Sequence, residues 1–61
     1  MKLEKLIYEG NKILSSFKVD RAHYESMLIF SKLNNTKLIS YYLNKDKKIS
    51  SKKVKLFLKK I

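Results

Sequence analysis

The chain of 61 residues has no cysteine and no proline, one glycine, Gly10, and one histidine, His23. Without cysteine it can form no disulfide, no thiolate zinc site and no iron–sulfur cluster, and one histidine is too few for a histidine-based metal site. A single glycine excludes glycine-rich phosphate-binding loops and argues against a sheet built on tight hairpins. These absences predict one small, mostly helical domain over residues 1–61.

Long apolar runs are also absent, since no segment approaches the roughly 18 apolar residues that a membrane span needs. The first five residues, MKLEK, lack the apolar block and the cleavage site of a signal peptide. The lack of cysteine fits a reducing compartment. We therefore expect a soluble, cytoplasmic domain that does not contact a membrane.

Arginine is scarce in a chain that is otherwise strongly basic. The formal net charge is +10, yet Arg21 is the only arginine among 15 basic residues. Residues 1–30 carry five basic and four acidic groups, whereas residues 31–61 carry ten and one. Such asymmetry is typical of proteins that bind nucleic acid or an anionic surface. Direct base readout favours arginine, however, so the composition argues against sequence-specific nucleic-acid recognition.

Hydrophobic periodicity predicts a first helix from about Lys2 to Ser16. The residues that share its core-facing arc are Leu3, Leu6, Ile7, Gly10, Ile13, Leu14 and Phe17. Glycine in a helix interior costs about 1 kcal/mol relative to alanine. We therefore expect Gly10 to be compensated by the close approach of another helix.

A second helix is predicted after Asp20, which is a good N-cap, with Val19 packing on Tyr24 as a hydrophobic staple. From Ala22 to Leu33 apolar residues cover nearly the whole circumference, so this helix is expected to be the central, buried one. Within this segment Ser26 and Ser31 suit close helix contacts.

Two shorter helices are expected in the second half. Asn34 is predicted to cap an amphipathic third helix that contains Leu38, Ile39, Tyr41, Tyr42 and Leu43. Residues 44–48 are polar and predict a loop. Ser50 is expected to cap a last helix that buries Val54, Phe57, Leu58 and Ile61. The predicted fold class is all-α: a small bundle of four to five short helices around a central buried helix.

The residues offer little for catalysis, for a cofactor or for a metal. His23 lies three and two residues from Asp20 and Glu25, a spacing that makes no orienting triad, so a surface histidine is expected. The serines have no nucleophile-elbow sequence around them, and no pair of acidic residues is spaced for metal or glycosidic chemistry. Alone, the chain is predicted to have no catalytic, cofactor-binding or metal-binding residue.

Two apolar residues stand on otherwise charged helix faces and are the best candidates for protein contact. Tyr8 is the one aromatic residue that clearly misses a core-facing arc, and Leu56 lies among the lysines of the last helix. Lys52, Lys55 and Lys59 share the face of Leu56. Isolated exposed apolar residues are common, and a lysine face is often only solvated. The lysines could alternatively follow a phosphate backbone.

Four segments of the chain, residues 6–14, 19–30, 33–39 and 44–50, resemble the N-terminal helical domain of the HemK family, the glutamine-N5 methyltransferases of peptide-chain release factors. Residues 6–14, LIYEGNKIL, resemble the family's opening helix, and residues 19–30, VDRAHYESMLIF, its next helix. Residues 33–39, LNNTKLI, are similar to the turn that follows, and residues 44–50, NKDKKIS, to the loop before the last helix. The likeness covers nearly the whole chain, through core and turn patterns rather than catalytic motifs.

The chain departs from the family pattern at several places. An Asp-Ala pair of the family corresponds to Glu25 and Ser26, a proline corresponds to Ala22, and the turn glycine is an asparagine. The Asn-Pro-Pro-Tyr motif of the catalytic domain is absent, as is a glycine-rich strand-turn-helix.

The resemblance implies a non-catalytic domain of a longer methyltransferase. Its partners would be a peptide-chain release factor and its own catalytic domain, and S-adenosylmethionine would bind to that catalytic domain only. Two alternatives stay open: a free-standing basic helical protein that binds nucleic acid non-specifically, and a small protein-interaction module.

Overall fold

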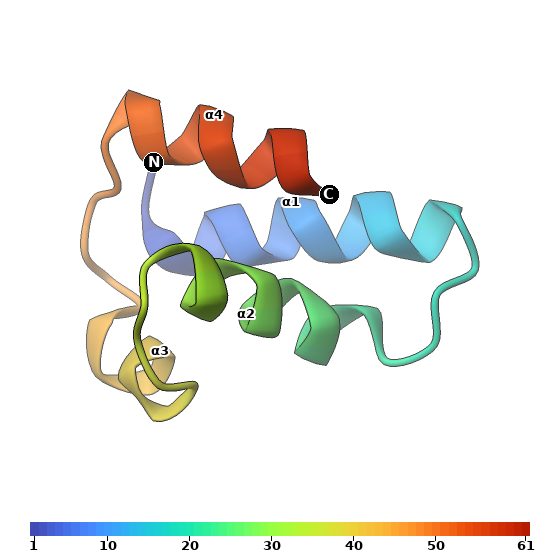
Figure 1. Cartoon of the computed structure of the whole chain (residues 1–61), viewed down its shortest axis with the longest axis horizontal. Coiled ribbons are helices and arrows are strands. Elements are labelled where there is room, and N and C mark those ends of the chain that lie inside the picture. The colour runs from blue at the N-terminus through green and yellow to red at the C-terminus, as the bar shows by residue number, and fades with distance from the viewer.

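A computed structural model describes all 61 residues and contains four α-helices and no strand (Figure 1). The helices are α1 (Leu3–Ser16), α2 (Ala22–Leu33), α3 (Ile39–Asn44) and α4 (Ser51–Lys60). The prediction of a small all-α fold is therefore confirmed. In Figure 1, α1 runs between α4 and α2, and α3 lies at the end of the molecule where the N-terminus also lies.

The core is built around α1, which has more buried residues than any other helix. They are Leu3, Leu6, Ile7, Gly10 and Leu14, all from the predicted core-facing arc. Ala22 and Met27 of α2, Tyr41 of α3 and Phe57 of α4 complete the buried apolar set. The first helix is thus confirmed, and it begins one residue later than expected.

Gly10 lies where three helices meet, as its place in the sequence predicted. A methyl group at Gly10 would overlap the Ser26 hydroxyl and would lie 2.7 Å from Cζ of Phe57. The Ser26 hydroxyl in turn donates a hydrogen bond of 2.9 Å to the carbonyl of Ile7. The small size of Gly10 and Ser26 therefore allows α1, α2 and α4 to approach closely.

The expectation that the second helix is buried on all sides is not confirmed. Although Ser26 and Met27 are buried, Tyr24 and Leu33 are exposed, with 40% and 38% of their surface accessible. The expected burial of Phe17 is wrong, because α1 ends at Ser16 and leaves this ring 73% exposed.

The way in which α1 ends explains why Phe17 is exposed although it continues the apolar period of the helix. Lys18 takes the left-handed conformation with φ 60°, its N–H donates to the carbonyl of Ser15, and Val19 N–H donates to Leu14. This pair of hydrogen bonds is a Schellman motif, in which lysine takes the position that glycine usually occupies. The chain therefore leaves the helix axis directly after Phe17.

Asp20 does not cap α2, contrary to expectation. The N-cap position belongs to Arg21, which has φ 56° and makes no side-chain capping hydrogen bond. Its guanidinium carbon instead lies 4.7 Å from the centre of the Tyr24 ring. The left-handed residue moves the start of the helix beyond the reach of the Asp20 carboxylate.

Asn34 was expected to begin the third helix, but it ends the second one. Its side-chain amide donates to the carbonyl of Phe30 at 3.0 Å, while Asn35 is left-handed and Thr36 N–H donates to Ser31. This is a second Schellman motif. The third helix starts only at Ile39, and no side chain caps it.

The predicted cap of α4 is confirmed, because the Ser50 hydroxyl accepts a hydrogen bond from Lys53 N–H at 3.3 Å. The polar loop was placed correctly except for Asn44, which still belongs to α3. This loop caps α1: Leu3 and Glu4 donate their N–H groups to the carbonyls of Lys47 and Lys45, both at 2.9 Å. Residues 1–4 and 45–49 are thereby joined.

Candidate binding surfaces

The contact residues predicted from the sequence are exposed, but they form two separate surfaces. Tyr8 is 55% exposed on α1, and Leu56 is 48% exposed on α4. Gly10 is the position of α1 that meets α4, and Tyr8 precedes it by two residues. Two residues correspond to a rotation of about 200° around the helix axis. Tyr8 therefore lies on the side of α1 that is turned away from α4 and from Leu56.

The surroundings of these two residues also differ. Lys12 extends over the Tyr8 ring, with Nζ 5.3 Å from the ring centre, and makes the one salt bridge of the structure, 3.5 Å to Glu9. On α4 the exposed residues Lys52, Lys55, Leu56 and Lys59 share one arc. That arc carries three positive charges that no carboxylate neutralises.

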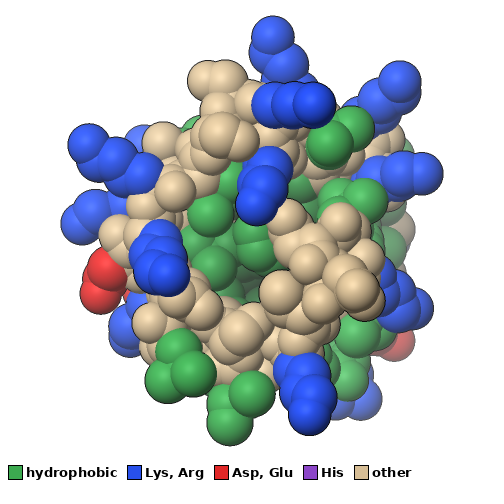
Figure 2. All heavy atoms as spheres, turned by 60° about the vertical axis from the view of Figure 1, so that its left-hand side comes forward, with side chains coloured by type: hydrophobic (Ala, Val, Ile, Leu, Met, Phe, Trp, Pro, Cys, Tyr) green, Lys and Arg blue, Asp and Glu red, His purple; other side chains and the backbone are tan.

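The largest apolar exposure is on α3, the helix that the sequence predicted to be amphipathic. Ile39, Tyr42 and Leu43 are exposed by 65%, 64% and 78%. Their spacing puts them on one arc of about 100°. We call these three residues the α3 face. Figure 2 shows apolar side chains projecting at the bottom of the view, where α3 lies.

The opposite side of α3 faces the protein. Tyr41 is buried, and its ring contacts those of Tyr42 and His23 edge-on, with centroid distances of 5.2 and 6.3 Å. Burial raises the pKa of the Tyr41 phenol, and the nearby Glu4 carboxylate and Tyr42 raise it further. A short helix thus holds one buried tyrosine and an uncovered apolar face.

Sequence reasoning identified the third helix as amphipathic but did not say which of its apolar residues face the core, and the structure buries Tyr41 and exposes the α3 face. A signal for this was present, because helical rotation places Leu38 and Tyr41 on one side and Ile39 and Leu43 on the other. The exposure of Tyr24 and Tyr42 also corrects the expectation that Tyr8 is the one aromatic residue off the core.

The structure also contains a hollow of about 230 Å³ between the end of α2, α3, the segment 47–49 and the start of α4. Its lining residues are Leu3, Phe30, Ser31, Asn34, Thr36, Ser40, Tyr41, Asn44, Lys47, Lys48, Ile49 and Lys53. Figure 2 shows apolar side chains at its bottom, with backbone, polar side chains and lysines around them. No sequence pattern had indicated it, because its residues come from five separate segments.

His23 is exposed, with its ring against Tyr41, and makes no hydrogen bond to Asp20 or Glu25. No group of three histidine, aspartate or glutamate side chains is arranged to hold a metal ion. None of the four helices has the length and apolar character required to cross a bilayer.

Comparisons of the chain with protein-family models, with curated proteins and with solved structures found no match.

Proposed function

We propose that the chain is a non-catalytic protein-binding module and that its α3 face docks on an acidic partner. The observation that carries the proposal is the exposure of Ile39, Tyr42 and Leu43 on one side of a helix. Apolar side chains that lie together on a surface, in place of scattered single ones, are typical of protein-interaction sites. Recognition of a helix face by an apolar groove uses this kind of spacing.

The charge around the α3 face supports an acidic partner. Lys37 precedes the helix and Lys45 follows it, both exposed, and residues 31–61 carry ten basic groups against one acidic group. A partner groove with an apolar centre and a rim of aspartate and glutamate would complement this surface. The proposal assigns no catalytic residue to the chain.

The resemblance to the HemK family gives a more specific version, in which the partner is a peptide-chain release factor or the catalytic domain of a parent methyltransferase. In this version the S-adenosylmethionine site belongs to the catalytic domain, and the chain works in the cytoplasm. Its support is the likeness of residues 6–14 and 19–30 to that family's helices. It retains Tyr8, Leu56, Lys52, Lys55 and Lys59 as further candidate contacts.

The experiment is a titration of the isotope-labelled chain, followed by backbone amide shifts, with two unlabelled probes. One probe is a helical peptide with leucine on one side and glutamate at the rim, and the other is a full-length release factor. We expect shifts centred on residues 39–43 with either probe. The triple variant Ile39→Ser, Tyr42→Ser, Leu43→Ser should abolish them, whereas Tyr8→Ser with Leu56→Ser, the matched control, should not.

The outcomes separate the two versions. Binding of the peptide but not of the release factor would overturn the release-factor version and keep the protein-binding proposal. Shifts confined to α4 or to the surroundings of Tyr8 would overturn the assignment to the α3 face. No response to either probe at millimolar concentration would overturn both versions.

One observation favours a different function, namely the exposed arc of Lys52, Lys55 and Lys59. Three lysines that contact phosphates on a single-stranded RNA give a slope of about −2 when log affinity is plotted against log salt. Such a slope for a 20-nucleotide RNA, lost when the three lysines are replaced by glutamine, would support non-specific nucleic-acid binding. A flat salt dependence would exclude it.

A further inference from the structure

The hollow between α2, α3 and α4 has an apolar floor. Phe30 lies at this floor, and its ring packs edge-on against the buried ring of Phe57, with centroids 5.9 Å apart. Leu3 is buried beneath it, and Ile49 packs on the same core. Because these side chains are part of the hydrophobic core, the floor is held in place before any ligand arrives.

The hollow also offers an accessible hydroxyl group that has no partner within the protein. Ser31 lines the hollow and is 5% exposed, and its hydroxyl makes no hydrogen bond within the protein. The other buried serine, Ser26, is fully satisfied by the carbonyl of Ile7. No buried side-chain polar atom of the protein lacks a partner, so the Ser31 hydroxyl is accessible and can donate a hydrogen bond to a ligand or accept one from it.

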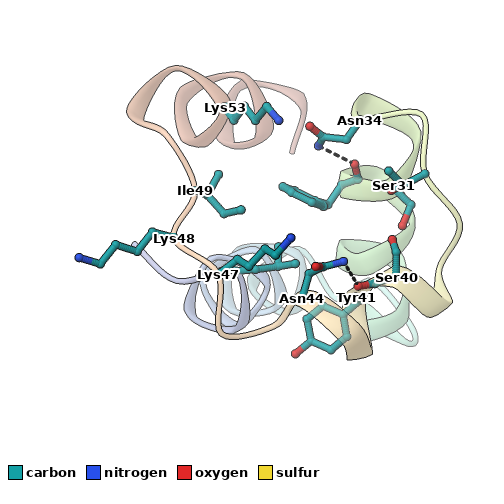
Figure 3. Close-up of a pocket in the computed structure, with 12 residues that line it drawn as sticks. Ser31, Asn34, Ser40, Tyr41, Asn44, Lys47, Lys48, Ile49 and Lys53 are labelled. Carbon is teal, nitrogen blue, oxygen red and sulfur yellow. Dashed lines mark hydrogen bonds between the residues drawn. The ribbon is translucent and has the colours of Figure 1, made fainter.

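Two amide side chains on the walls are fixed in orientation. Asn34 Nδ2 donates to the carbonyl of Phe30 at 3.0 Å, and Asn44 Nδ2 donates to the carbonyl of Ser40 at 2.8 Å. Figure 3 shows both hydrogen bonds and both side chains at the edge of the hollow. Each amide retains one N–H donor and its oxygen for a ligand, so the walls can both donate and accept.

The charge at the rim is positive and unopposed. Lys47 and Lys53 extend over the hollow toward Asn44 and Asn34, whereas Lys48 extends away from it (Figure 3). No acidic residue lines the hollow, and neither lysine makes a salt bridge. Two ammonium groups at opposite edges of a hollow with polar walls favour an anion.

We propose that this hollow binds a small phosphate monoester that carries a compact ring, such as a nucleoside monophosphate. The ring lies on Phe30 and Ile49, its polar edge bonds to Ser31 and the two asparagines, and the phosphate lies between Lys47 and Lys53. A volume of about 230 Å³ is below the range of about 300–1,000 Å³ typical of sites for drug-sized ligands, which favours a single nucleotide over a dinucleotide cofactor.

The site is independent of the proposed protein-binding surface. Ser40, Tyr41 and Asn44 line the hollow, and they lie on the side of α3 opposite the α3 face. A variant that removes the α3 face should therefore leave ligand binding within about twofold of the original. The two proposals can accordingly fail separately.

The test is calorimetric and NMR titration of the full chain at low salt with uridine monophosphate, uridine and inorganic phosphate. We expect uridine monophosphate to bind most tightly and to shift the amides of residues 30–36 and 44–50. The double variant Lys47→Gln, Lys53→Gln should weaken its binding by at least about tenfold, since each charge-assisted hydrogen bond contributes more than a neutral one. The control Lys52→Gln, Lys59→Gln makes the same change in net charge away from the hollow and should have less than about a twofold effect.

Four results would overturn the proposal. Equal weakening by both lysine pairs would indicate diffuse attraction, and equal affinity for phosphate and uridine monophosphate would indicate an adventitious ion only. If uridine binds as tightly as uridine monophosphate, the phosphate group contributes nothing to binding. If a ten-nucleotide RNA binds more tightly than uridine monophosphate and shifts the amides of α4 in place of those around the hollow, the lysines bind a polymer.

The variant Ser31→Ala, which keeps the fold, should weaken binding of both uridine monophosphate and uridine but not of phosphate.

Discussion

The two helices α1 and α3 are in contact, yet they use their apolar residues in opposite ways. On α1 the apolar arc lies against α2 and α4, and five of its residues are buried. On α3 one residue, Tyr41, is buried, while Ile39, Tyr42 and Leu43 are uncovered. A chain of this size has too little surface to cover every apolar arc. The difference shows that an amphipathic pattern identifies a face to be buried without identifying what buries it.

The comparison is tested most directly by making the same substitution on each helix. Leu6→Ala on α1 removes a side chain with no accessible surface, and we expect a loss of about 2–5 kcal/mol in the free energy of unfolding. Leu43→Ala on α3 removes one that is 78% exposed and should change it by less than about 0.5 kcal/mol. Urea denaturation followed by circular dichroism measures both.

If Leu6→Ala does not fold, Leu6→Val provides a milder variant at the same position. Equal losses for the α1 and α3 substitutions would mean that the α3 face is covered in solution, and they would contradict the comparison.

The second prediction concerns the close approach that α1 makes and α3 does not. Gly10→Ala should destabilise the protein by about 1–3 kcal/mol, because overpacking at Ser26 and Phe57 exceeds the gain in helix propensity. Lys5→Ala, on the exposed side of α1, is the matched control and should be nearly neutral. Thermal unfolding of the two variants distinguishes them, and a stabilised Gly10→Ala protein would show that the helices can separate without loss.

The third prediction concerns the N-terminal ends of α4 and α2. Ser50→Ala should cost about 1 kcal/mol, because it removes the hydroxyl that caps α4. Asp20→Ala should cost much less, because Asp20 accepts no capping hydrogen bond from α2. Chemical denaturation of both variants is the measurement, and a larger loss for Asp20→Ala would indicate that α2 begins earlier in solution.

The smallest expected effect is a dependence on pH through Tyr41. Because burial raises its pKa in the folded protein, the phenol contributes stability that is fully present below its unfolded pKa and is lost as pH rises through the folded value. Stability should therefore fall more between pH 9 and pH 11 in the original protein than in Tyr41→Phe, by thermal melting. Parallel curves for the two proteins would contradict the burial of this hydroxyl.

The sequence was sufficient for most of the fold but for little of the candidate binding surfaces. The 3.6-residue period located α1, Gly10 indicated a helix crossing, and Ser50 marked a helix start. Local patterns succeed at such positions because the cause, a periodic apolar arc or a capping hydroxyl, lies within a few residues. The expectation that Tyr8 and Leu56 are exposed was confirmed for the same reason.

The wrong predictions share a different cause: the backbone takes conformations that the residue types do not predict. Lys18 and Arg21 both take left-handed conformations, which lysine and arginine rarely adopt, and these conformations displace Phe17 and Asp20 from their expected roles. Asn34 can cap either end of a helix, so its type left the choice open. The hollow depends on Ser31, Lys47 and Lys53 meeting in space, which no local pattern contains.

The capping of α1 by the segment 45–49 has a consequence for the order in which the protein is made. The N–H groups of Leu3 and Glu4 find their acceptors at Lys47 and Lys45, and Ile49 N–H returns a hydrogen bond of 2.7 Å to Met1. During translation α1 therefore leaves the ribosome before the segment that caps it, and before Phe57 can cover Gly10. We expect α1 to become stable only once Phe57 has left the ribosome, so that the first helix depends on α4, which is made after it.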